Sequence, residues 1–498
     1  MFPLNSRYKG LKNPNFFILA KTLHFRDFAK QSSAAFTIAL IECERMKVWL
    51  INCIDEERKR NIEKTYCSLG TAYLASYVRK YGGYSDLVLS EAGQKLTSEQ
   101  IALVKPDIVG ISSVTQNFDI AESVAKKIKK ELDVPIIVGG KHISALPSTL
   151  SKTFSIAVIG EGEETFLELL RAYESHGLEN SKLENLNGIA YKKDDKVRVT
   201  PRRKLIEPLD KIPFPARDLL DITKDNLHML TSRGCPYHCV FCASAAFWQR
   251  ARFNSAGYVV SEIKHLVETY HADNINLLDD LFIANKKRLM EIAQLIKTEG
   301  LHNKVSFTCL ARANLVDVNI VSVLKHINVT TVNMGLESGC EKTLNFLKCG
   351  SVKVKQNMNA VNLLKRYGFH VVASFVIGVP GETWDDSMET LQFLKKARLN
   401  DGETYVLLPY PGTQLWNMAK QQGIVNENMD WSKFEIYFED NPLNRVVVAD
   451  KLLRTDLLKL LGMFNAEWER HKRRHVFIGR VKSVVNLIME KTPFYQHN

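Results

Sequence analysis

Short apolar runs alternate with helical stretches in the early part of the chain. The apolar runs cover residues 48–53, 86–89, 108–112, 135–138 and 156–159. Between them, residues 69–81 and 120–132 have apolar positions at helical spacing, and the second stretch ends in basic residues that suit a helix C-terminus. Strands that are apolar throughout and are separated by helices are typical of a parallel sheet buried on both faces. The pattern therefore predicts a Rossmann-like, doubly wound α/β sheet over residues 46–170.

Residues 171–226 are predicted to connect this sheet to the next part of the chain. Apolar positions at 189–191 and 197–199 flank a polar turn, which predicts a hairpin. Prolines then follow that keep a chain extended, as an interdomain linker requires. They are Pro201, Pro208, Pro213 and Pro215.

A second alternation of strands and helices runs over residues 227–412. Helical spacing occurs at residues 259–270, 287–299, 354–367 and 387–397. The six predicted strands cover residues 227–231, 275–278, 305–310, 331–336, 371–377 and 404–408. Six such units suit a partial parallel (β/α)6 barrel, whose functional site lies at the carboxyl ends of the strands.

The two ends of the chain follow neither pattern. Residues 413–498 are predicted as a helical, basic C-terminal region, with an amphipathic stretch at 450–468 and a basic run at 470–475. A helical cap on the barrel with a solvated basic face is favoured; an interfacial helix that contacts anionic lipid at the membrane periphery stays open. Nucleic acid is not favoured, because the basic run is short and no reading module accompanies it. Residues 1–45 are predicted as an extension, and acidic residues argue against a transit peptide there.

Composition narrows the partners and the compartment. At 498 residues the chain can form two or three domains, and its net charge of +12 suggests an anionic partner such as nucleic acid, anionic lipid or a phosphate-bearing cofactor. No apolar run approaches the roughly 20 residues of a membrane span, so no transmembrane segment is predicted. The nine cysteines are not evenly paired, which favours a reducing, cytoplasmic compartment.

Three of the cysteines carry the strongest chemical signal. Cys235, Cys239 and Cys242 have Cys-x3-Cys-x2-Cys spacing directly after the first predicted barrel strand. One short loop of thiolates can hold a single iron–sulfur cluster, and three ligands leave one iron of a four-iron cluster open for catalysis. A zinc site is less favoured because no second Cys pair accompanies the motif, and three unrelated core thiols are the other alternative.

The cysteine loop, with the aromatic Phe241 before its last cysteine, resembles the radical S-adenosylmethionine (SAM) superfamily. The resemblance implies a 4Fe-4S cluster whose open iron is chelated by SAM. It also implies reductive cleavage of SAM to a 5′-deoxyadenosyl radical that removes hydrogen from a substrate. An electron donor such as flavodoxin or ferredoxin is then expected.

The blocks at the ends of the barrel strands resemble the same family. The resemblance implies that the acids after the second strand contact the amine of SAM, that the polar pair after the fourth strand holds its ribose or carboxylate, and that residues 376–379 lie near adenine. The arginine after the third strand is a candidate for a carboxylate contact. For any one of the acids, a salt bridge on the barrel rim is the structural alternative. The predicted SAM-binding residues are Phe241, Asp279, Asp280, Arg312, Glu337, Ser338, Val376 and Gly378.

Small and polar residues also follow the strands of the first sheet, where ligands of open α/β sheets bind. Glycines let the backbone approach a large ligand closely, and hydroxyls can bond to its periphery. Over residues 46–170 the pattern resembles the cobalamin-binding domain that precedes many radical SAM enzymes. The Asp-x-His-x-x-Gly loop that supplies a lower axial histidine does not occur in the sequence, so base-off cobalamin without a histidine ligand is implied. The predicted cobalamin-binding residues are Ser112, Ser113, Thr115, Gly139, Gly140, His142, Gly160, Glu161 and Gly162.

The two resemblances together predict a cobalamin-dependent radical SAM enzyme. Methyl transfer to an unactivated carbon, or to phosphorus, of a small-molecule, lipid or natural-product substrate is favoured, because such a carbon is not a nucleophile and cannot attack a sulfonium directly. Oxidative cyclisation or rearrangement without methyl transfer is the alternative. A non-catalytic cobalamin carrier or sensor is disfavoured by the intact cysteine loop and the strand-end blocks. For residues 46–170, a Rossmann-like spacer that binds no cofactor is the structural alternative.

Overall fold

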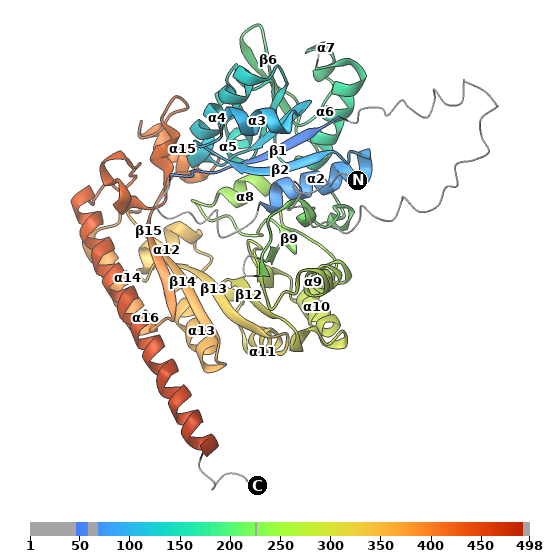
Figure 1. The fold of residues 1–498 in the computed structure, drawn as a ribbon. Coiled ribbons are helices and arrows are strands. Elements are labelled where there is room, and N and C mark those ends of the chain that lie inside the picture. The colour runs from blue at the N-terminus through green and yellow to red at the C-terminus, as the bar shows by residue number, and fades with distance from the viewer. Residues whose placement is uncertain (1–45, 58–67, 179, 225–226, 492–498) are drawn as a thin grey trace, which may run out of the picture. The chain divides into compact units, whose positions relative to one another are not determined.

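The computed structural model describes residues 46–57, 68–178, 180–224 and 227–491, and only the backbone of residues 180, 181 and 476–491 (Figure 1). The predicted extension over residues 1–45 therefore lies outside the described residues. Within those described ranges, no helix combines the length and the apolar character that a membrane crossing requires.

The first sheet has seven strands in the order β2-β1-β3-β4-β5-β6-β7. Neighbours among the first five strands pair in parallel, whereas β6 pairs antiparallel with both β5 and β7. The strands are β1 (Val48–Cys53), β2 (Leu87–Ala92), β3 (Ile108–Ser112), β4 (Ile136–Gly139), β5 (Ile156–Val158), β6 (Ile189–Lys193) and β7 (Lys196–Val199). The predicted hairpin forms, but it extends this sheet, because Ile189, Ala190 and Tyr191 bury their side chains beside β5. That part of the predicted linker is thus part of the sheet.

Helices cover both faces of this sheet, which confirms the doubly wound fold. Leu50 points to the face covered by α2 and α6, whereas the next residue, Ile51, points to the face covered by α3 and α4. Successive side chains of a strand alternate between faces, so a strand buried on both sides must be apolar throughout. The helices of this part are α2 (Leu69–Gly82), α3 (Ser98–Val104), α4 (Phe118–Glu131), α5 (Lys141–Ala145), α6 (Glu163–His176) and α7 (Asn180–Leu183).

The second sheet has six parallel strands in the order β15-β14-β13-β12-β11-β8, and it is the predicted partial barrel (Figure 1). Its strands are β8 (His228–Met229), β11 (Asn274–Leu277), β12 (Ser306–Ala311), β13 (Val329–Glu337), β14 (His370–Ile377) and β15 (Asp401–Val406). A separate antiparallel pair, β9 (Ser232–Arg233) and β10 (Arg252–Phe253), brackets the cysteine loop. The segments directly before and after the cysteine loop therefore pair with each other.

Several barrel helices begin where a side chain caps the first turn. Ser255, Asp317 and Thr383 accept hydrogen bonds from backbone N–H groups of α9, α11 and α14. Such caps satisfy donors that the first helical turn leaves unpaired, so these helix starts are encoded locally. The helices are α8 (Ala243–Trp248), α9 (Ala256–Tyr270), α10 (Lys286–Thr298), α11 (Val318–His326), α12 (Glu341–Lys348), α13 (Val354–Arg366), α14 (Trp384–Ala397), α15 (Gln414–Gln421) and α16 (Arg454–Lys491).

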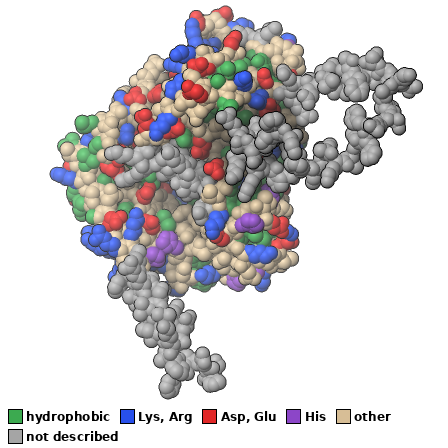
Figure 2. Space-filling view, viewed as in Figure 1, with side chains coloured by type: hydrophobic (Ala, Val, Ile, Leu, Met, Phe, Trp, Pro, Cys, Tyr) green, Lys and Arg blue, Asp and Glu red, His purple; other side chains and the backbone are tan. Residues whose placement is uncertain are grey.

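The C-terminal region packs on both sheets. Along α16, Leu457, Leu460, Phe464 and Trp468 join the barrel core at helical spacing, which confirms the predicted helical cap. The segment before α16 instead contacts helix α4, which covers the first sheet, since the backbone N–H of Trp431 donates to Asp119 Oδ2 at 2.8 Å. On the face that Figure 2 shows, Lys and Arg side chains are interspersed with Asp and Glu side chains. The net positive charge is therefore not concentrated in one patch on that face.

Candidate functional site

The cysteine loop is braced by several segments of the barrel. The Val240 N–H donates to Leu347 O and the Leu415 N–H donates to Val240 O, both at 3.1 Å. The thiol of Cys349 donates to His238 O at 3.1 Å. The three motif cysteines are free thiols and are only partly buried. The fold thus holds the loop in place while leaving its three cysteines only partly buried.

The thiols of the loop lie within electrostatic reach of one another. Burial raises the pKa of Cys235 and of Cys242, and the nearby charges of Cys239 and Asp280 raise it further. Arg312 lies beside them, with its Nη1 donating to Cys239 Sγ at 3.3 Å. A fixed guanidinium offsets part of the negative charge that thiolates would bring to this loop.

The arrangement of the three thiols on one loop is compatible with an iron–sulfur cluster. Throughout the part of the chain that the structure describes, no three His, Cys, Asp or Glu side chains converge closely enough to hold one metal ion. Cysteines that ligate different irons of one cluster stand further apart than the ligands of one ion, so three free thiols on one braced loop suit a cluster.

The two adjacent acids after β11 have different surroundings. Asp279 is fully buried, and its carboxylate accepts hydrogen bonds from Thr231 N at 2.5 Å and Ser232 N at 3.0 Å. Asp280 is exposed and accepts a 2.6 Å hydrogen bond from Ser244 Oγ, at the start of α8. Asp279 therefore anchors the strand that leads into the cysteine loop, and a contact with SAM would require it to give up these partners. Asp280 is the acid of the pair that faces the loop.

The other predicted SAM residues also have partners inside the protein. Glu337 forms a buried ion pair with Lys348, with Nζ and Oε1 2.7 Å apart. Ser338 is fully buried, with its Oγ 2.8 Å from Thr390 Oγ1. Phe241 lies under the Lys348 ammonium, which is 5.9 Å from the ring centroid. The roles of these residues toward SAM remain predictions.

Val376 and Gly378 mark the carboxyl end of β14. Val376 is mostly buried, and Gly378 has a φ of +76°, which disfavours other residues at this turn. A Cβ at Gly378 would lie 3.1 Å from Leu457 of α16. This strand end is therefore packed against the C-terminal helix, and its predicted proximity to adenine stays a prediction.

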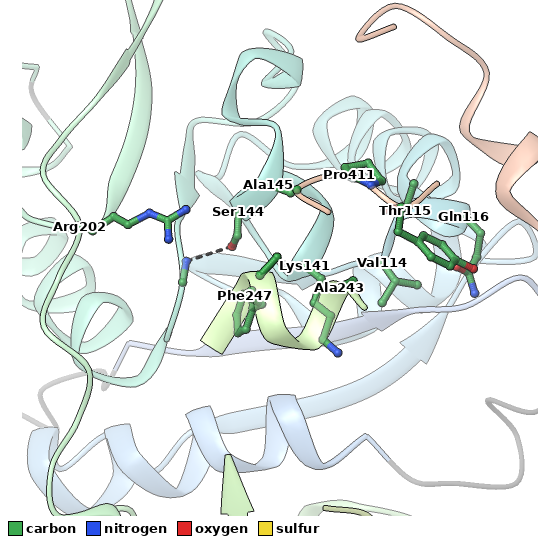
Figure 3. Close-up of a pocket in the computed structure, with 14 residues that line it drawn as sticks. Val114, Thr115, Gln116, Lys141, Ser144, Ala145, Arg202, Ala243, Phe247 and Pro411 are labelled. Carbon is green, nitrogen blue, oxygen red and sulfur yellow. Dashed lines mark hydrogen bonds between the residues drawn. The ribbon is translucent and has the colours of Figure 1, made fainter. Parts of the chain in front are cut away.

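Two cavities lie at the carboxyl edge of the first sheet. The sheet cavity, of about 210 Å3, reaches between strand residues Leu50, Gly110 and Ile137. The junction cavity, of about 300 Å3, lies between the loops of this sheet, helix α8 and residues 410–412 (Figure 3). Lys141, Gly160 and Phe247 line both cavities, so the two are adjoining parts of one site. Phe247 belongs to α8, which begins directly after Cys242.

Most of the predicted cobalamin residues are brought together at these cavities. Thr115 lines the junction cavity and Gly160 lines both, whereas Ser113 and His142 line neither. The remaining residues of the set line the sheet cavity: Ser112, Gly139, Gly140, Glu161 and Gly162.

Glycines provide a test of whether a large ligand fits there. A Cβ added at Gly160 would meet no atom within 4 Å, and one at Gly139 would meet only the Val158 Cβ at 3.9 Å. Gly139 is not required by internal packing, and its bare backbone suits close approach of a ligand, whereas Gly160 has a φ of +85° that itself favours glycine. At Gly140, in contrast, a Cβ would lie 2.2 Å from Ser113 O, so this glycine serves the turn itself. The sheet edge therefore fits the predicted corrinoid.

His142 is a core residue, contrary to the prediction that it lines the site. Its ring packs between Phe118 and Trp431, with centroid distances of 4.0 and 4.4 Å. Its two ring nitrogens lie 3.4 Å from Thr115 Oγ1 and 3.2 Å from Thr149 Oγ1. The side chain that follows the Gly139-Gly140 turn is thus buried in the core and lines neither cavity. Burial lowers the pKa of His142 to about 3.

This burial predicts an acid-sensitive contribution to stability. Because the pKa of His142 falls to about 3 on folding from an unfolded value of about 6.5, only the unfolded chain binds this proton between those values. The free energy of unfolding should therefore decrease as the pH is lowered from 6.5 toward 3. We expect the free energy of unfolding of the wild type, measured in urea, to exceed that of His142→Gln by less at pH 4.5 than at pH 7. A difference that stayed constant over this range would contradict the assignment.

A buried ion network joins the first sheet to the cysteine loop. Glu161 Oε1 accepts from Arg233 Nη1 and Arg252 Nη2, both at 2.8 Å, and its Oε2 accepts from Arg252 Nη1 at 2.9 Å. Arg233 also donates to Glu163 Oε1 at 2.5 Å. Its guanidinium lies 5.3 Å from the Trp248 ring centroid. The carboxylate of Glu161, predicted as a cobalamin contact, is therefore engaged within the protein.

Sequence reasoning did not single out the partners of Glu161 in this network. Arg233 stands two positions before the first cysteine, which is the only local signal that could have drawn attention to it. Glu163 stands two positions after Glu161 in the sequence, whereas Arg252 becomes a neighbour of Glu161 only in the fold. The same holds for the arginine at the rim of the junction cavity, Arg202.

Comparison with known proteins agrees with this architecture. The family model of the radical SAM superfamily matches residues 229–394, and that of the B12 binding domain matches residues 59–170. The fold and site are thus those of a radical SAM enzyme that carries a B12-binding domain. A radical SAM domain implies a 4Fe-4S cluster and SAM, and a B12-binding domain implies cobalamin.

The chain belongs to the cobalamin-dependent radical SAM enzyme family. It is 36% identical over 391 residues to the uncharacterized methyltransferase PH0819 of Pyrococcus horikoshii, which covers 76% of this chain and 83% of that protein. It is 28% identical over 413 residues to the anaerobic magnesium-protoporphyrin IX monomethyl ester cyclase of Rubrivivax gelatinosus, with 78% and 71% covered. In fold it is similar to the radical SAM methyltransferase TsrM of Kitasatospora setae, with a TM-score of 0.63, 16% identity and 76% of each chain covered.

Proposed function

We propose that the protein is a methyltransferase that acts on an unactivated carbon, or on phosphorus, of a small-molecule, lipid or natural-product substrate. The observation that carries the proposal is helix α8. It begins directly after Cys242, and its Phe247 lines both cavities at the edge of the cobalamin-type sheet. One short helix thus links the predicted cluster ligands to the predicted corrinoid site. The relative in Pyrococcus horikoshii, whose printed name is that of a methyltransferase, supports the same reaction type.

The roles of the residues follow from their positions. We assign the cluster to Cys235, Cys239 and Cys242, with Arg312 offsetting their charge and Asp280 available for the amine of SAM. We assign the corrinoid to the edge marked by Gly139 and Gly160. When bound, the cluster with SAM supplies hydrogen abstraction and cobalamin supplies the methyl group. The chain's own part is to hold these groups on either side of α8 and to exclude water from the space between them.

We further propose that the cobalamin is bound base-off and without a histidine ligand to cobalt. The one histidine of the predicted set, His142, is buried under the loop between two aromatic rings, which supports this. The absence of the Asp-x-His-x-x-Gly loop from the sequence agrees with it. Electron paramagnetic resonance of the Co(II) form, recorded without oxygen, tests this. Splitting of the signal by an axial nitrogen would show that a histidine is bound.

The reaction type is tested with SAM that is isotopically labelled in its methyl group. Extracts that contain the native substrate, incubated with the reconstituted protein and a reductant such as flavodoxin or ferredoxin, should yield 5′-deoxyadenosine and a product that carries the label. A product without label, formed together with deoxyadenosine, would favour the cyclase alternative. The similarity to the Rubrivivax gelatinosus cyclase is the observation that keeps this alternative in view.

A glycine substitution tests the corrinoid site separately from catalysis. Gly139 ends β4, where a β-branched side chain is compatible with the strand, and its Cβ direction is free of close contacts. Gly139→Val should therefore fold normally but fill part of the sheet cavity and weaken corrinoid binding about tenfold or more, since even one bad contact costs over 1 kcal/mol. Gly139→Ala, the smaller control, should bind nearly as the wild type does. Equal binding by all three proteins, measured by absorbance titration, would place the corrinoid elsewhere.

We propose finally that the basic turn of α16 can contact anionic lipid if the substrate is membrane-borne. Lys472 pairs with Asp401 at 3.4 Å, whereas Arg473 and Arg474 are exposed. Two exposed arginines give only a weak, salt-sensitive attraction to such a surface. Co-sedimentation with phosphatidylserine vesicles, compared between the wild type and a variant with both arginines changed to glutamine, tests this contact.

A further inference from the structure

The charges that line the two cavities do not cancel. In the sheet cavity the charged lining residues are Lys141, Glu161, Glu163 and Arg233. The two carboxylates there are engaged by arginines in the buried network described above. In the junction cavity the charged lining residues are Lys141 and Arg202, and among the described residues no acid lines it. Among the described lining residues, the positive charge is therefore uncompensated in the junction cavity.

Lys141 and Arg202 stand out from most other basic residues near the site. Both are exposed, and among the residues that the structure describes neither forms an ion pair or a side-chain hydrogen bond. They come from different elements, Lys141 from α5 and Arg202 from the segment after β7, yet both line the junction cavity (Figure 3). Arg203, the next residue in sequence, is in contrast paired with Glu164 at 3.6 Å. The fold thus brings to one cavity two cations that pair with no described residue.

The rest of the junction cavity is suited to hold a ligand. Ser144 Oγ accepts a 2.9 Å hydrogen bond from Gly160 N, which fixes the wall between α5 and the loop after β5 (Figure 3). Thr115 and Gln116 add side chains that can donate hydrogen bonds, whereas the Tyr410 hydroxyl donates to Phe434 O at 3.3 Å. Donors that surround unpaired cations match a phosphate, phosphonate or carboxylate group.

We infer that the junction cavity is an anion-binding site in which Arg202 and Lys141 hold an acidic group of the bound ligand. This rests on the proposed function in one respect, namely that corrinoid and substrate meet at this sheet edge. The acidic group has two possible sources with the same chemistry. It is the phosphodiester of the cobalamin nucleotide loop, or it is a phosphate, phosphonate or carboxylate of the substrate.

The test compares Lys141→Gln/Arg202→Gln with a control of equal charge change, Lys130→Gln/Arg366→Gln. Both control residues are exposed and form no side-chain hydrogen bond or ion pair with described residues. Cobalamin, cobinamide (which lacks the nucleotide loop and its phosphate) and inorganic phosphate are titrated into each protein, the last with and without bound corrinoid. Loss of two charged contacts should weaken binding of the anion about ten- to hundredfold.

The two sources give different results. If cobalamin binds more weakly to the cavity variant while cobinamide does not, the anion is the cofactor's phosphodiester. If both corrinoids bind as to the wild type, but only the wild type and the control bind inorganic phosphate when corrinoid is loaded, the anion belongs to the substrate. If neither cobalamin nor phosphate distinguishes the cavity variant from the control, the inference is overturned. A chain that binds no corrinoid at all would count against the proposed function, while phosphate binding to the corrinoid-free protein would still decide the inference.

Discussion

Replacing Glu161 with glutamine is expected to lower the free energy of unfolding by about 3 kcal/mol or more, because removing one charge from a buried ion network leaves its partners uncompensated. Glu161 lies between Arg233 and Arg252, and all three side chains are at least 90% buried. A neutral amide cannot accept from both guanidinium groups through two oxygens. Guanidinium chloride unfolding of the cofactor-free protein would measure the loss.

The matched control for this substitution is Glu184→Gln. Glu184 pairs with Lys193 at 2.6 Å, but both side chains are more than 40% exposed. Pairs exposed to solvent contribute about 0–1 kcal/mol, so the same chemical change should have little effect at this position. A loss at Glu161 no larger than the loss at Glu184 would mean that the network does not hold the first sheet to the cysteine loop.

The backbone of the fold follows closely from the sequence where both faces of a strand are buried. Residues 48–53 and 108–112 are predicted as strands and form β1 and β3 with the same bounds. The second strand was predicted to end at residue 89, but β2 continues to Ala92. It forms an edge of the sheet, where Ser90 and Glu91 can lie partly exposed. Because an edge strand can contain polar residues, a prediction based on apolar runs ends such a strand too early.

Side-chain roles were harder to predict than elements. Asp279 and Asp280 are adjacent in sequence, but one is buried beneath the cysteine loop and the other is exposed beside α8. The difference depends on Thr231, which is 48 residues away and whose backbone N–H donates a hydrogen bond to the Asp279 carboxylate. Glu161 and Arg252 are 91 residues apart. The sequence shows that such residues are charged. Only the fold determines which partner forms hydrogen bonds with each of them.

For the cluster ligands, in contrast, the prediction depends only on the spacing of the three cysteines in the sequence. The three thiols stand on one loop, so they come together whatever the rest of the chain does. Changing any one of Cys235, Cys239 or Cys242 to alanine is therefore expected to abolish cluster assembly, since each loss leaves a four-iron cluster with two protein ligands. Iron content and the absorbance of the anaerobically reconstituted protein measure assembly, and 5′-deoxyadenosine formation from SAM should fall to background.

Cys349→Ala is the control that makes this result specific. Its thiol is exposed and donates to His238 O within the same loop, so the substitution removes a neighbouring sulfur without removing a motif cysteine. We expect this variant to bind iron and to cleave SAM nearly as the wild type does. A motif variant that kept its iron and still formed deoxyadenosine would show that the loop is not the cluster site. Since Phe247 of α8 joins this loop to both cavities, the proposed reaction would then lose its geometric basis as well.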